Sequence, residues 1–545
     1  MGADMAWDPI RSRNRIARFM TTVPQSAIDV RTFDQTYLLQ RVRDAQARGK
    51  RLGFDESPIF AVPRNRAVLV DGVHVYVQLL DYHDRLQDQG RETEASHKRV
   101  LQFLHLHYSA TDRVVEEFEA QRVDYHGPRL HAVLVTPVGD ERQRVLRAVA
   151  FAVTLKETIE AAGQNIGGAR LQTRVRIGID TGRAVAVSSG RGADMEPLFL
   201  GSPANHAAKL AEGDHPGIYL SDRAREVLGE PSVGWASERS TSLAEDRQYG
   251  LANAGYGQAW SGLDPAPIRA RVLAAVRALQ TDMDLTALTS PEATFRFHRH
   301  EPPLKTIDFA ELMPSRSIRM GLASVFADLS GFTAYVDACI RGRRIAEMTA
   351  NLHVIRGELA ACARDDFGAR KVRFIGDCLH GLVAVGTRLA TEPASTVDAA
   401  VMLSGGLRSS FNLCKATLPG IREMGIAIGS EFGETPVSRV GIRGDRSVRC
   451  ATSKAVSTSE AIQSDLNGRQ TALGPNALAN ASPAVRRAFE AGPVYDMDHD
   501  RAGHVVTPAP APSVARPAAL SSGLLISQGA TAAGSVRERG SGRHA

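Results

Sequence analysis

The feature of this sequence that most constrains its fold is an internal repeat, because one order of predicted elements occurs twice. Each copy begins with an apolar strand that ends in an acidic residue. It continues through helical segments into a β-hairpin and returns in a strand that contains glycines. The first copy covers residues 66–230 and the second covers residues 319–466. This order predicts a duplicated α/β domain.

The two copies can be aligned at their hairpins and at their returning strands. Residues 123–133 lie on residues 372–382, and residues 178–182 lie on residues 425–429. Shared order and shared turn glycines indicate a duplication.

The repeat divides the chain into segments. The N-terminal arm contains one predicted helix, 32–46, and the connecting segment contains another, 267–281. In the first copy, residues 75–87 are predicted to be helical because the strand before them ends at Asp71. The segments are the arm (1–62), the first domain (63–230), the connecting segment (231–318), the second domain (319–500) and a Pro-, Ser-, Gly- and Ala-rich tail predicted to be disordered (501–545).

Composition excludes several classes of protein. The 545 residues are 43% hydrophobic and 23% charged, which is typical of a soluble globular chain. The net charge of +6 is spread without a dense basic block, which argues against nucleic-acid binding and fits a small anionic substrate. We find no run of eighteen apolar residues and no apolar core of a signal peptide, so we expect a cytoplasmic protein without membrane insertion.

Cysteine and histidine patterns do not predict a metal site. The five cysteines all lie in the C-terminal half, their number is odd and none has Cys-x-x-Cys spacing, so reduced thiols are expected. His298 and His300 form a His-x-His pair, but no third ligand follows at a suitable spacing. A solvated loop is therefore the favoured interpretation of this pair.

Asp328 is the acid at the end of the first strand in the second copy. A glycine-containing turn and a predicted helix follow it, so the carboxylate is expected beside backbone N–H groups. Such an arrangement can hold a divalent cation and a polyphosphate together, although an acid here can also simply cap the helix. The turn residues that could offer N–H groups or a hydroxyl to phosphates are Ser330, Gly331, Phe332 and Thr333.

A second acid, Asp377, lies at the turn of the second hairpin. If its strand neighbours that of Asp328, the two carboxylates and the backbone carbonyl of Leu329 supply the oxygen ligands that Mg²⁺ and Mn²⁺ prefer. Paired cations of this kind activate an attacking hydroxyl and neutralise charge on a phosphoryl group and its leaving diphosphate. The alternative is two unrelated surface acids.

Residues 326–333 (FADLSGFT) and 374–377 (FIGD) resemble the class III nucleotide cyclase domain. The resemblance implies an α+β, ferredoxin-like cyclase fold in each half. It also implies that Asp328 and Asp377 bind two divalent ions, Mn²⁺ or Mg²⁺. Domains of that family pair head to tail. The resemblance therefore implies two tandem cyclase-like domains paired as a pseudo-heterodimer, either within one chain or between two chains.

The first half resembles the same family through residues 178–182 and 201–210. In the family, one partner supplies an Asn and an Arg, four residues apart, to the transition state. Asn205 and Lys209 have this spacing, with Lys in place of Arg, and residues four apart lie on one face of a helix. The resemblance implies that Lys209 stabilises charge at the α-phosphate as a point cation. Without the resemblance, Asn205 and Lys209 would be interpreted as ordinary solvated residues on a helix.

The two halves differ in ways that imply a single working site. The first half keeps Asp71 but has Pro128 where the second metal-binding acid should be. The second half has Arg449 and Ser453 where the Asn and Arg would be. The resemblance thus implies an active site made of Asp328, Asp377, Asn205 and Lys209, and a second site around Asp71, Arg373 and Arg449 that is dead or regulatory.

Two positions bear on the choice of base. Purine cyclases of the family carry a Lys three residues before the hairpin Gly and an Asp or similar residue seven before the Asn. Here these positions are Asp124 and Leu198. A carboxylate cannot donate to a purine carbonyl, and Leu cannot accept from an amine. Asp124 could accept from uracil N3–H or cytosine N4–H₂ and Leu198 could narrow the pocket, or Asp124 could be a solvent-facing hairpin residue.

These differences resemble the pyrimidine cyclases of bacterial antiphage defence, which make cyclic UMP or cyclic CMP to switch on an effector. The implied activity is conversion of UTP to 3′,5′-cyclic UMP and diphosphate, with CTP, ATP and GTP as alternative substrates. A silent nucleotide-sensing module is the alternative from another class, and the retention of both metal-binding acids argues against it. A diguanylate cyclase is disfavoured because the Gly-Gly-Asp/Glu-Glu-Phe turn is missing. The expected partners are a nucleoside triphosphate and a downstream effector of the product.

Overall fold

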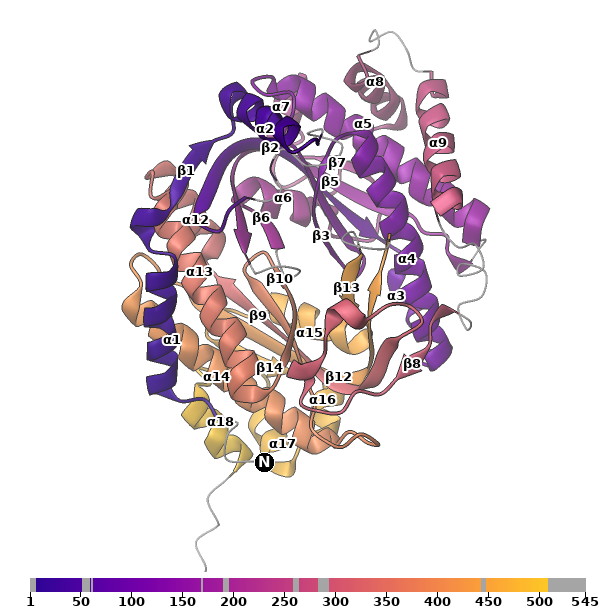
Figure 1. Ribbon diagram of the computed structural model, residues 1–545. Helices are drawn as coiled ribbons and strands as arrows, with labels where there is room; N and C mark the ends of the chain where they lie inside the picture. The colour runs from indigo at the N-terminus through magenta and orange to yellow at the C-terminus, as the bar shows by residue number, and fades with distance from the viewer. Residues whose placement is uncertain are drawn as a thin grey trace, which may run out of the picture. The chain divides into compact units, whose positions relative to one another are not determined.

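The computed structural model describes residues 6–50, 59, 62–167, 170–189, 196–257, 264–282, 294–442 and 447–507 (Figure 1). Residues up to Pro508 form one unit of contacts. Two curled, mainly antiparallel sheets with helices packed on them make up this unit, in agreement with the predicted α/β class. None of the helices in the described part of the chain is long and apolar enough to cross a membrane.

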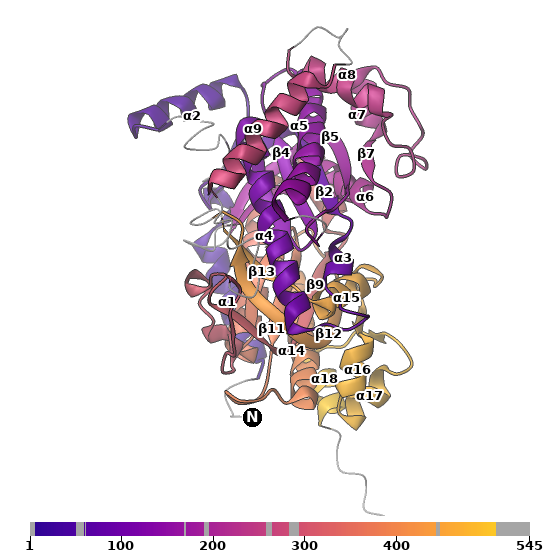
Figure 2. The same ribbon diagram turned by 90° about the vertical axis from the view of Figure 1, so that its right-hand side faces the viewer.

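The first sheet has β2 at its centre. Its strands run in the order β3-β4-β2-β5-β6, β3 also approaches β6, and helices α4, α5, α8 and α9 pack together over one face (Figure 2). The strands are β1 (Asp29–Thr32, parallel to β2), β2 (Arg66–Leu79), β3 (Gln121–His126), β4 (Arg129–Leu134), β5 (Val175–Ser189), β6 (Glu196–Leu200) and β7 (Gly217–Leu220, parallel to β5). The helices of this half are α3 (Tyr82–Arg85), α4 (Glu94–Glu117), α5 (Glu141–Ala162), α6 (Ser202–Ala211), α7 (Asp222–Leu228), α8 (Glu245–Gly255) and α9 (Ala266–Asp282).

The second sheet repeats this plan around β9. Its strands run in the order β10-β11-β9-β12-β14-β15, and α13 and α14 pack on the face of β9 that carries Val325, Ala327 and Leu329. The strands are β8 (Phe297–His298), β9 (Ser317–Ser330), β10 (Arg370–Ile375), β11 (Cys378–Val383), β12 (Gly425–Val440), β13 (Val448–Ala451), β14 (Gln470–Leu473) and β15 (Val494–Tyr495). The helices are α12 (Phe332–Arg341), α13 (Ile345–Ala361), α14 (Pro393–Thr417), α15 (Lys454–Ser464), α16 (Pro475–Asn480), α17 (Pro483–Phe489) and α18 (His499–Val506).

Strand register shows how the two halves correspond. Gly178 lies opposite Tyr76 and Gly429 lies opposite Phe326. Each glycine also meets a helix: a Cβ would lie 2.2 Å from the Ala207 carbonyl oxygen at Gly178, and 2.5 Å from that of Ser459 at Gly429. Gly178 therefore corresponds to Gly429, and the predicted alignment of 178–182 on 425–429 is wrong by four residues.

The same register corrects the predicted role of Asp71. Because Tyr76 corresponds to Phe326, the counterpart of Asp328 is Gln78. Asp71 lies in the middle of β2, more than half exposed, with its carboxylate 3.4 Å from the Arg183 guanidinium. The prediction of helix at 75–87 is wrong because β2 continues to Leu79, burying alternate valines against the helical layer.

The alignment of the hairpins is confirmed. His131 lies opposite Tyr76 and His380 opposite Phe326, so Pro128 corresponds to Asp377 and Asp124 to Arg373. Both hairpins carry a register shift at the same place, just before these last two residues.

Two segments that the sequence places outside the domains contribute to the folded cores. The connecting segment contributes to the first core, since α8 and α9 pack on α5 through residues such as Leu251 and Ile268. Residues 501–506, predicted to begin a disordered tail, belong to α18, which Asp498 caps and which packs on α14 through Ala502. Residues 508–545 of the predicted tail lie outside the described residues.

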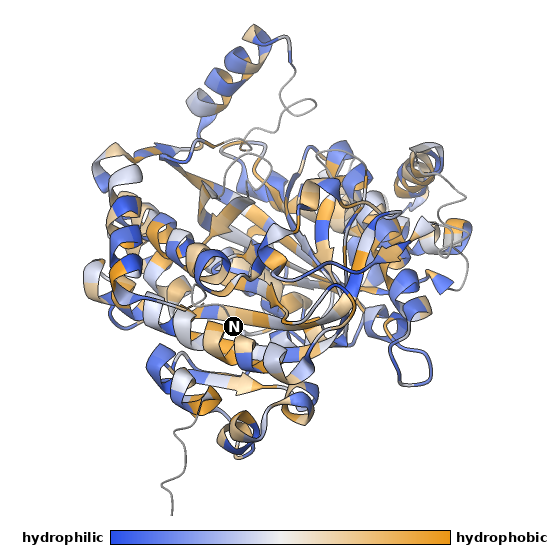
Figure 3. Cartoon of the chain, turned by 60° about the horizontal axis from the view of Figure 1, so that its bottom comes forward, coloured by the Kyte–Doolittle hydropathy of each residue, from blue (hydrophilic) through white to orange (hydrophobic). Residues whose placement is uncertain are grey.

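The two halves bury parts of each other. Val440, Val448 and Cys450 of the second half lie in the core beneath α4, and Val185 and Leu200 of the first half lie in the core beneath α13. Figure 3 shows apolar residues along the strands of both sheets and on the helices packed against them. This reciprocal packing joins the halves through hydrophobic surface.

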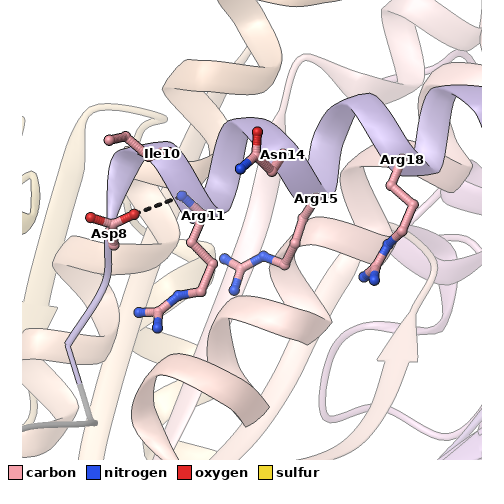
Figure 4. Close-up of a pocket in the computed structure, with 6 residues that line it drawn as sticks. All are labelled: Asp8, Ile10, Arg11, Asn14, Arg15 and Arg18. Carbon is pink, nitrogen blue, oxygen red and sulfur yellow. Dashed lines mark hydrogen bonds between the residues drawn. The ribbon is translucent and has the colours of Figure 1, made fainter.

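The arm is attached to the second half through α1 (Pro9–Thr22). The Arg15 guanidinium donates to the carboxylates of Glu358 and Asp366 at 2.6–2.9 Å, and both acids are fully buried. Arg11, Arg15 and Arg18 extend from the same side of α1 (Figure 4). Helix α2 (Gln35–Ala47), which the sequence places at 32–46, begins at the cap formed by Asp34.

We predict that Arg15→Ala destabilises the protein by about 3–5 kcal/mol, because it leaves the buried Glu358 carboxylate without its cation and leaves Asp366 with only the partly exposed Arg11. Arg13→Ala, an exposed change on the same helix, should alter stability by less than about 0.5 kcal/mol. Chemical unfolding of the two variants beside wild type measures both effects. Equal stability of the two variants would contradict the assigned role of Arg15.

Candidate active site

Asp328 and Asp377 lie side by side at the end of the second sheet. Ala327 on β9 pairs with Leu379 on β11, and one step further along this register brings Asp328 to the hairpin turn that carries Asp377. The Leu329 backbone N–H donates to the Asp377 carboxylate. The Leu329 side chain is buried, so only its backbone can face a ligand.

The electrostatics of this pair fit a bound cation. Burial raises the pKa of Asp328 to about 6. Burial first, and then the charge of Asp328, raises the pKa of Asp377 well above its usual range. No group of three or more His, Cys, Asp and Glu residues is placed to hold a metal in the described part of the chain. A divalent ion here would therefore use the two acids and a backbone carbonyl, with substrate oxygens as its other ligands.

The turn after β9 opens α12 without a side-chain cap. Gly331 has φ +86°, a conformation that favours glycine, and it is the N-cap of the helix. The Phe332 side chain is buried in the core, so this residue can offer a phosphate only its N–H. The uncapped N–H groups of Phe332 and Thr333, next to the Ser330 hydroxyl, suit an anion.

Helix α6 of the first half reaches this turn of the second half. Asn205 and Lys209 are both exposed, as expected for two residues on one face of α6. The Asn205 side-chain amide donates to the Thr333 hydroxyl at 3.0 Å. The Ser202 N–H at the start of α6 donates to the Asp337 carboxylate of α12, also at 3.0 Å. The structure thus brings Asn205 to the predicted phosphate turn and places Lys209 one helical turn further along.

The two predicted base-recognition residues have different surroundings. Asp124 accepts a hydrogen bond from the Arg373 guanidinium through Oδ1, while its Oδ2 has no hydrogen-bond partner among the described residues. Leu198 is 4% exposed and packs in the core shared with Val325 and Ala327. Only Asp124 therefore offers a free polar atom.

Tyr76 is a residue that the sequence prediction missed. It is partly buried and stacks on His131 with ring centroids 3.9 Å apart. Burial raises the pKa of its phenol above the usual value, and the nearby charges of Asp124 and Asp377 raise it further. An aromatic face between these two acids is suited to contact a base. The signal in the sequence is the alternation of valines around Tyr76, which is typical of a strand and not of the predicted helix.

The second half has a helix equivalent to α6, and its residues differ from those predicted. Gly201 and Ser453 occupy the same N-cap position, so the counterparts of Asn205 and Lys209 are Ser457 and Ala461. The prediction that places Arg449 and Ser453 there is wrong, because it lies eight residues too early in the chain. Arg449 lies on β13, where its carbonyl accepts a hydrogen bond from Arg373.

Side chains of the protein fill the second, pseudo-symmetric site. The Glu460 carboxylate of α15 lies 2.8 Å from the Arg129 guanidinium and 3.6 Å from His126. Burial alone would raise the pKa of Glu460, but Arg129 and His126 lower it to about 2. The same two helix and hairpin positions in the first site hold the smaller, uncharged side chains of Ala208 and Cys378.

The phosphate turn of the second site is also altered. Asp81 replaces Gly331 at the start of the short helix α3, and its carboxylate accepts from the Arg174 backbone N–H at 2.8 Å. A carboxylate at this position repels a triphosphate. Gln78 and Pro128 stand where the first site has Asp328 and Asp377, so the second site lacks this pair of acids as well.

Comparison with known proteins finds relatives in sequence and in fold. Residues 89–246 match the family model described as the adenylate and guanylate cyclase catalytic domain. A protein named uridylate cyclase from a Rhizobium species is 51% identical over 91% of this chain and 94% of its own length. A uridylate cyclase from Pseudomonas aeruginosa is 38% identical over 79% of this chain and 81% of its own.

A solved structure covers nearly the whole chain. It is that of a class III adenylyl cyclase-like ATP-binding protein from Pseudomonas aeruginosa, with a TM-score of 0.81 and 33% identity over 92% of this chain and 100% of that one. Similarity of this extent, in sequence and in fold, shows that the chain belongs to the class III nucleotide cyclase family.

Proposed function

We propose that this enzyme converts UTP to 3′,5′-cyclic UMP and diphosphate at a single site built from both halves. The observation that carries the proposal is the contact between Asn205 and Thr333, because it joins the α6 residues to the turn beside the metal-binding acids. The two relatives named uridylate cyclase, at 51% and 38% identity, support UTP as the substrate.

The reaction forms a bond between the ribose 3′-oxygen and the α-phosphorus while the bond from this phosphorus to the bridging β-phosphate oxygen breaks. The 3′-hydroxyl loses its proton and diphosphate leaves. Divalent ions, Mn²⁺ or Mg²⁺, held by Asp328, Asp377 and the Leu329 carbonyl would neutralise phosphate charge and favour the 3′-alkoxide.

The chain's own groups hold the substrate in place. The backbone N–H groups that open α12 bind phosphate oxygens, and the Ser330 and Thr333 hydroxyls add donors. Asn205 is held by Thr333 at the same turn. The exposed Lys209 ammonium supplies positive charge where charge develops at the α-phosphate. Because Lys is a point cation, it does this without the two-pronged hydrogen bonding of Arg.

Base choice rests on Asp124 in this proposal. With Oδ1 held by Arg373, its Oδ2 can accept from N3–H of uracil. The same oxygen could accept from the amino group of cytosine or adenine, so CTP remains the alternative pyrimidine substrate. ATP is the purine alternative, because the similar Pseudomonas aeruginosa protein of known structure is described as ATP-binding. Leu198 would act only through packing, by setting the position of β6.

We further propose that the product is a second messenger of antiphage defence and acts in the cytoplasm on an effector that binds the cyclic nucleotide. This proposal rests on the resemblance to the bacterial pyrimidine cyclases. Phage plating on cells that carry the wild-type protein with its effector, compared with cells that carry Asp377→Ala, measures it. Equal plating on both would contradict it.

We expect UTP to be turned over fastest when the four triphosphates are assayed separately with Mn²⁺ and the cyclic products are identified by mass. Asp328→Ala and Asp377→Ala should abolish turnover, and Lys209→Ala should lower kcat about 100- to 1,000-fold by removing charge stabilisation at the transition state.

The matched control is Gln78→Ala, which changes the position equivalent to Asp328 in the first half and should keep wild-type turnover. The absence of a cyclic product from every triphosphate would favour the silent sensing module over an enzyme. Product from ATP alone would refute the pyrimidine assignment.

Protons should compete with the cation at the acid pair. The folded-state pKa of both acids is raised, so the ionised pair costs stability as pH rises from 3.8 through about 6 for Asp328. A bound cation offsets that cost. We therefore expect Mn²⁺ to raise the melting temperature more at pH 8 than at pH 5.5, with about 2.7 kcal/mol of stabilisation at one hundred times Kd.

Asp377→Asn is the control for this measurement. It should abolish the gain from Mn²⁺ and melt no lower than wild type without metal, because a like-charge repulsion is removed. An equal gain at both pH values, or in Asp377→Asn, would show that the ion binds elsewhere.

A further inference from the structure

His206 lies between two buried carboxylates on the flank of α6. Its Nδ1 is 3.2 Å from Oδ2 of Asp180, and its Nε2 is 2.8 Å from Oε2 of Glu238. The side chains of Asp180 and Glu238 are 0% and 3% exposed, whereas that of His206 is 22% exposed. Both ring nitrogens thus face carboxylate oxygens, which can only accept when ionised, so both nitrogens must donate. A histidine that donates twice is an imidazolium.

The two carboxylates are themselves fixed in place. Asp180 on β5 accepts from the Thr181 N–H at 2.9 Å and the Ser221 hydroxyl at 2.5 Å, and it pairs with Arg223 of α7. Glu238 accepts from the Asp222 N–H at 2.5 Å, at the start of α7. The acids that hold His206 therefore belong to β5 and to the loop beyond α7, and they do not move with α6.

Helix α6 is otherwise held by packing on β5 and β2 and by the hydrogen bonds of Ser202 and Asn205 to α12. It is 10 residues long, has no side-chain cap, and packs on β5 through the close contact of Gly178 with Ala207. Consecutive helical residues are about 100° apart, so His206 lies on the flank next to Asn205 and Lys209. A roll of about 10° would move side-chain tips, about 6 Å from the axis, by about 1 Å. A misplacement of this size can cost about 100-fold in rate.

The equivalent helix of the second half serves as an internal comparison. Thr458 of α15 occupies the position of His206, and Glu431 occupies that of Asp180. The Glu431 carboxylate instead accepts from the backbone N–H groups of Asn476 and Ala477 at the start of α16. The charged contact is thus present on the helix that carries Asn205 and Lys209, and it is absent from the described α15, which faces the filled site.

We propose that His206, held as an imidazolium between Asp180 and Glu238, fixes the rotation of α6 and is the positioning residue for Asn205 and Lys209. This inference rests on the proposed function of that site. It assigns a catalytic consequence to a residue that does not touch the substrate.

The charge of His206 gives the proposal a pH dependence. The charged groups that face it are Asp180 from β5, Arg223 from α7 and Glu238 from the following loop, while Asp337 of α12 contacts the start of α6. The hydrogen bond to Asp180 raises the pKa of His206 above 6.5, and Glu238 raises it further. A raised folded-state pKa makes the stabilising contact complete at low pH, and the contact is lost as pH rises through that pKa.

The test uses the full chain and three variants, with Mn²⁺ at a saturating concentration and UTP varied from below to well above KM. His206→Gln should lower kcat about 10- to 100-fold with little change in KM, as expected for groups that act in the transition state. Glu238→Gln keeps the size of the side chain but removes one charge. We expect kcat to fall at alkaline pH as His206 loses its proton. The Glu238→Gln change should move this fall to lower pH by about one unit, because it removes one of the two charges that stabilise the imidazolium. His215→Gln, an exposed change in the loop after α6, should match wild type in both respects.

An NMR titration of the His206 ring shows independently of turnover whether the imidazolium exists. A ring pKa at or below 6.5, or a Glu238→Gln profile that superimposes on that of wild type, would overturn the proposal. Wild-type kcat in His206→Gln would overturn it as well. If His206→Gln does not fold, the pH dependence of kcat in Glu238→Gln, compared with wild type, tests the proposal by itself. Absence of turnover in wild type would refute the proposed function, an outcome separate from these.

Discussion

Burial of each half's strand ends in the other half's core is the constraint on which the rest of the structure depends. Val185 and Leu200 lie beneath α13, and Val440 and Cys450 lie beneath α4. This packing holds α6 against α12, so that Asn205 reaches Thr333. The proposed active site is complete only because hydrophobic surface, which carries no chemistry of its own, fixes two sets of polar residues against each other.

The duplicated halves have separated their tasks. Around the first site, Ala208 and Cys378 are small and uncharged. Burial raises the pKa of Asp328, and burial together with the charge of Asp328 raises that of Asp377. At the equivalent site, Glu460 and Arg129 form an internal ion pair in the corresponding space. The first site thus keeps two neighbouring carboxylates whose repulsion a bound cation can relieve. At the second site the carboxylate is already paired with a guanidinium of the protein. Because Arg129 belongs to the first half and Glu460 to the second, the ion pair at the second site helps to hold the two halves together.

The sequence was sufficient where local chemistry decides structure. The two hairpins were aligned correctly because their turns are set by neighbouring residues such as Gly127 and Gly376, both with positive φ. The pair of Asp328 and Asp377 followed from the same turn and strand pattern. Registers between distant strands could not be predicted. The alignment at Gly178 is wrong by four residues, and the apolar run that ends at Asp71 predicts a counterpart of Asp328 seven residues before the actual one, Gln78.

Other features depend on contacts between residues far apart in the chain. His206 is recognisable as a charged contact only when β5 and the loop carrying Glu238 have been brought beside α6. The Arg373 contact of Asp124 joins two hairpins from different halves, and no pattern along the sequence marks it. The spacing of Leu198 to Asn205 predicts a pocket residue, whereas the structure buries its side chain in a core shared by both halves.

The most direct test of the central claim is the number of nucleotides bound per chain. Calorimetric titration with a non-hydrolysable UTP analogue and Mn²⁺ should give one site per chain, and Asp377→Ala should weaken that site while Gln78→Ala leaves it unchanged. Two equivalent sites per chain, or binding that depends on Gln78 in place of Asp377, would contradict a single site shared between the halves.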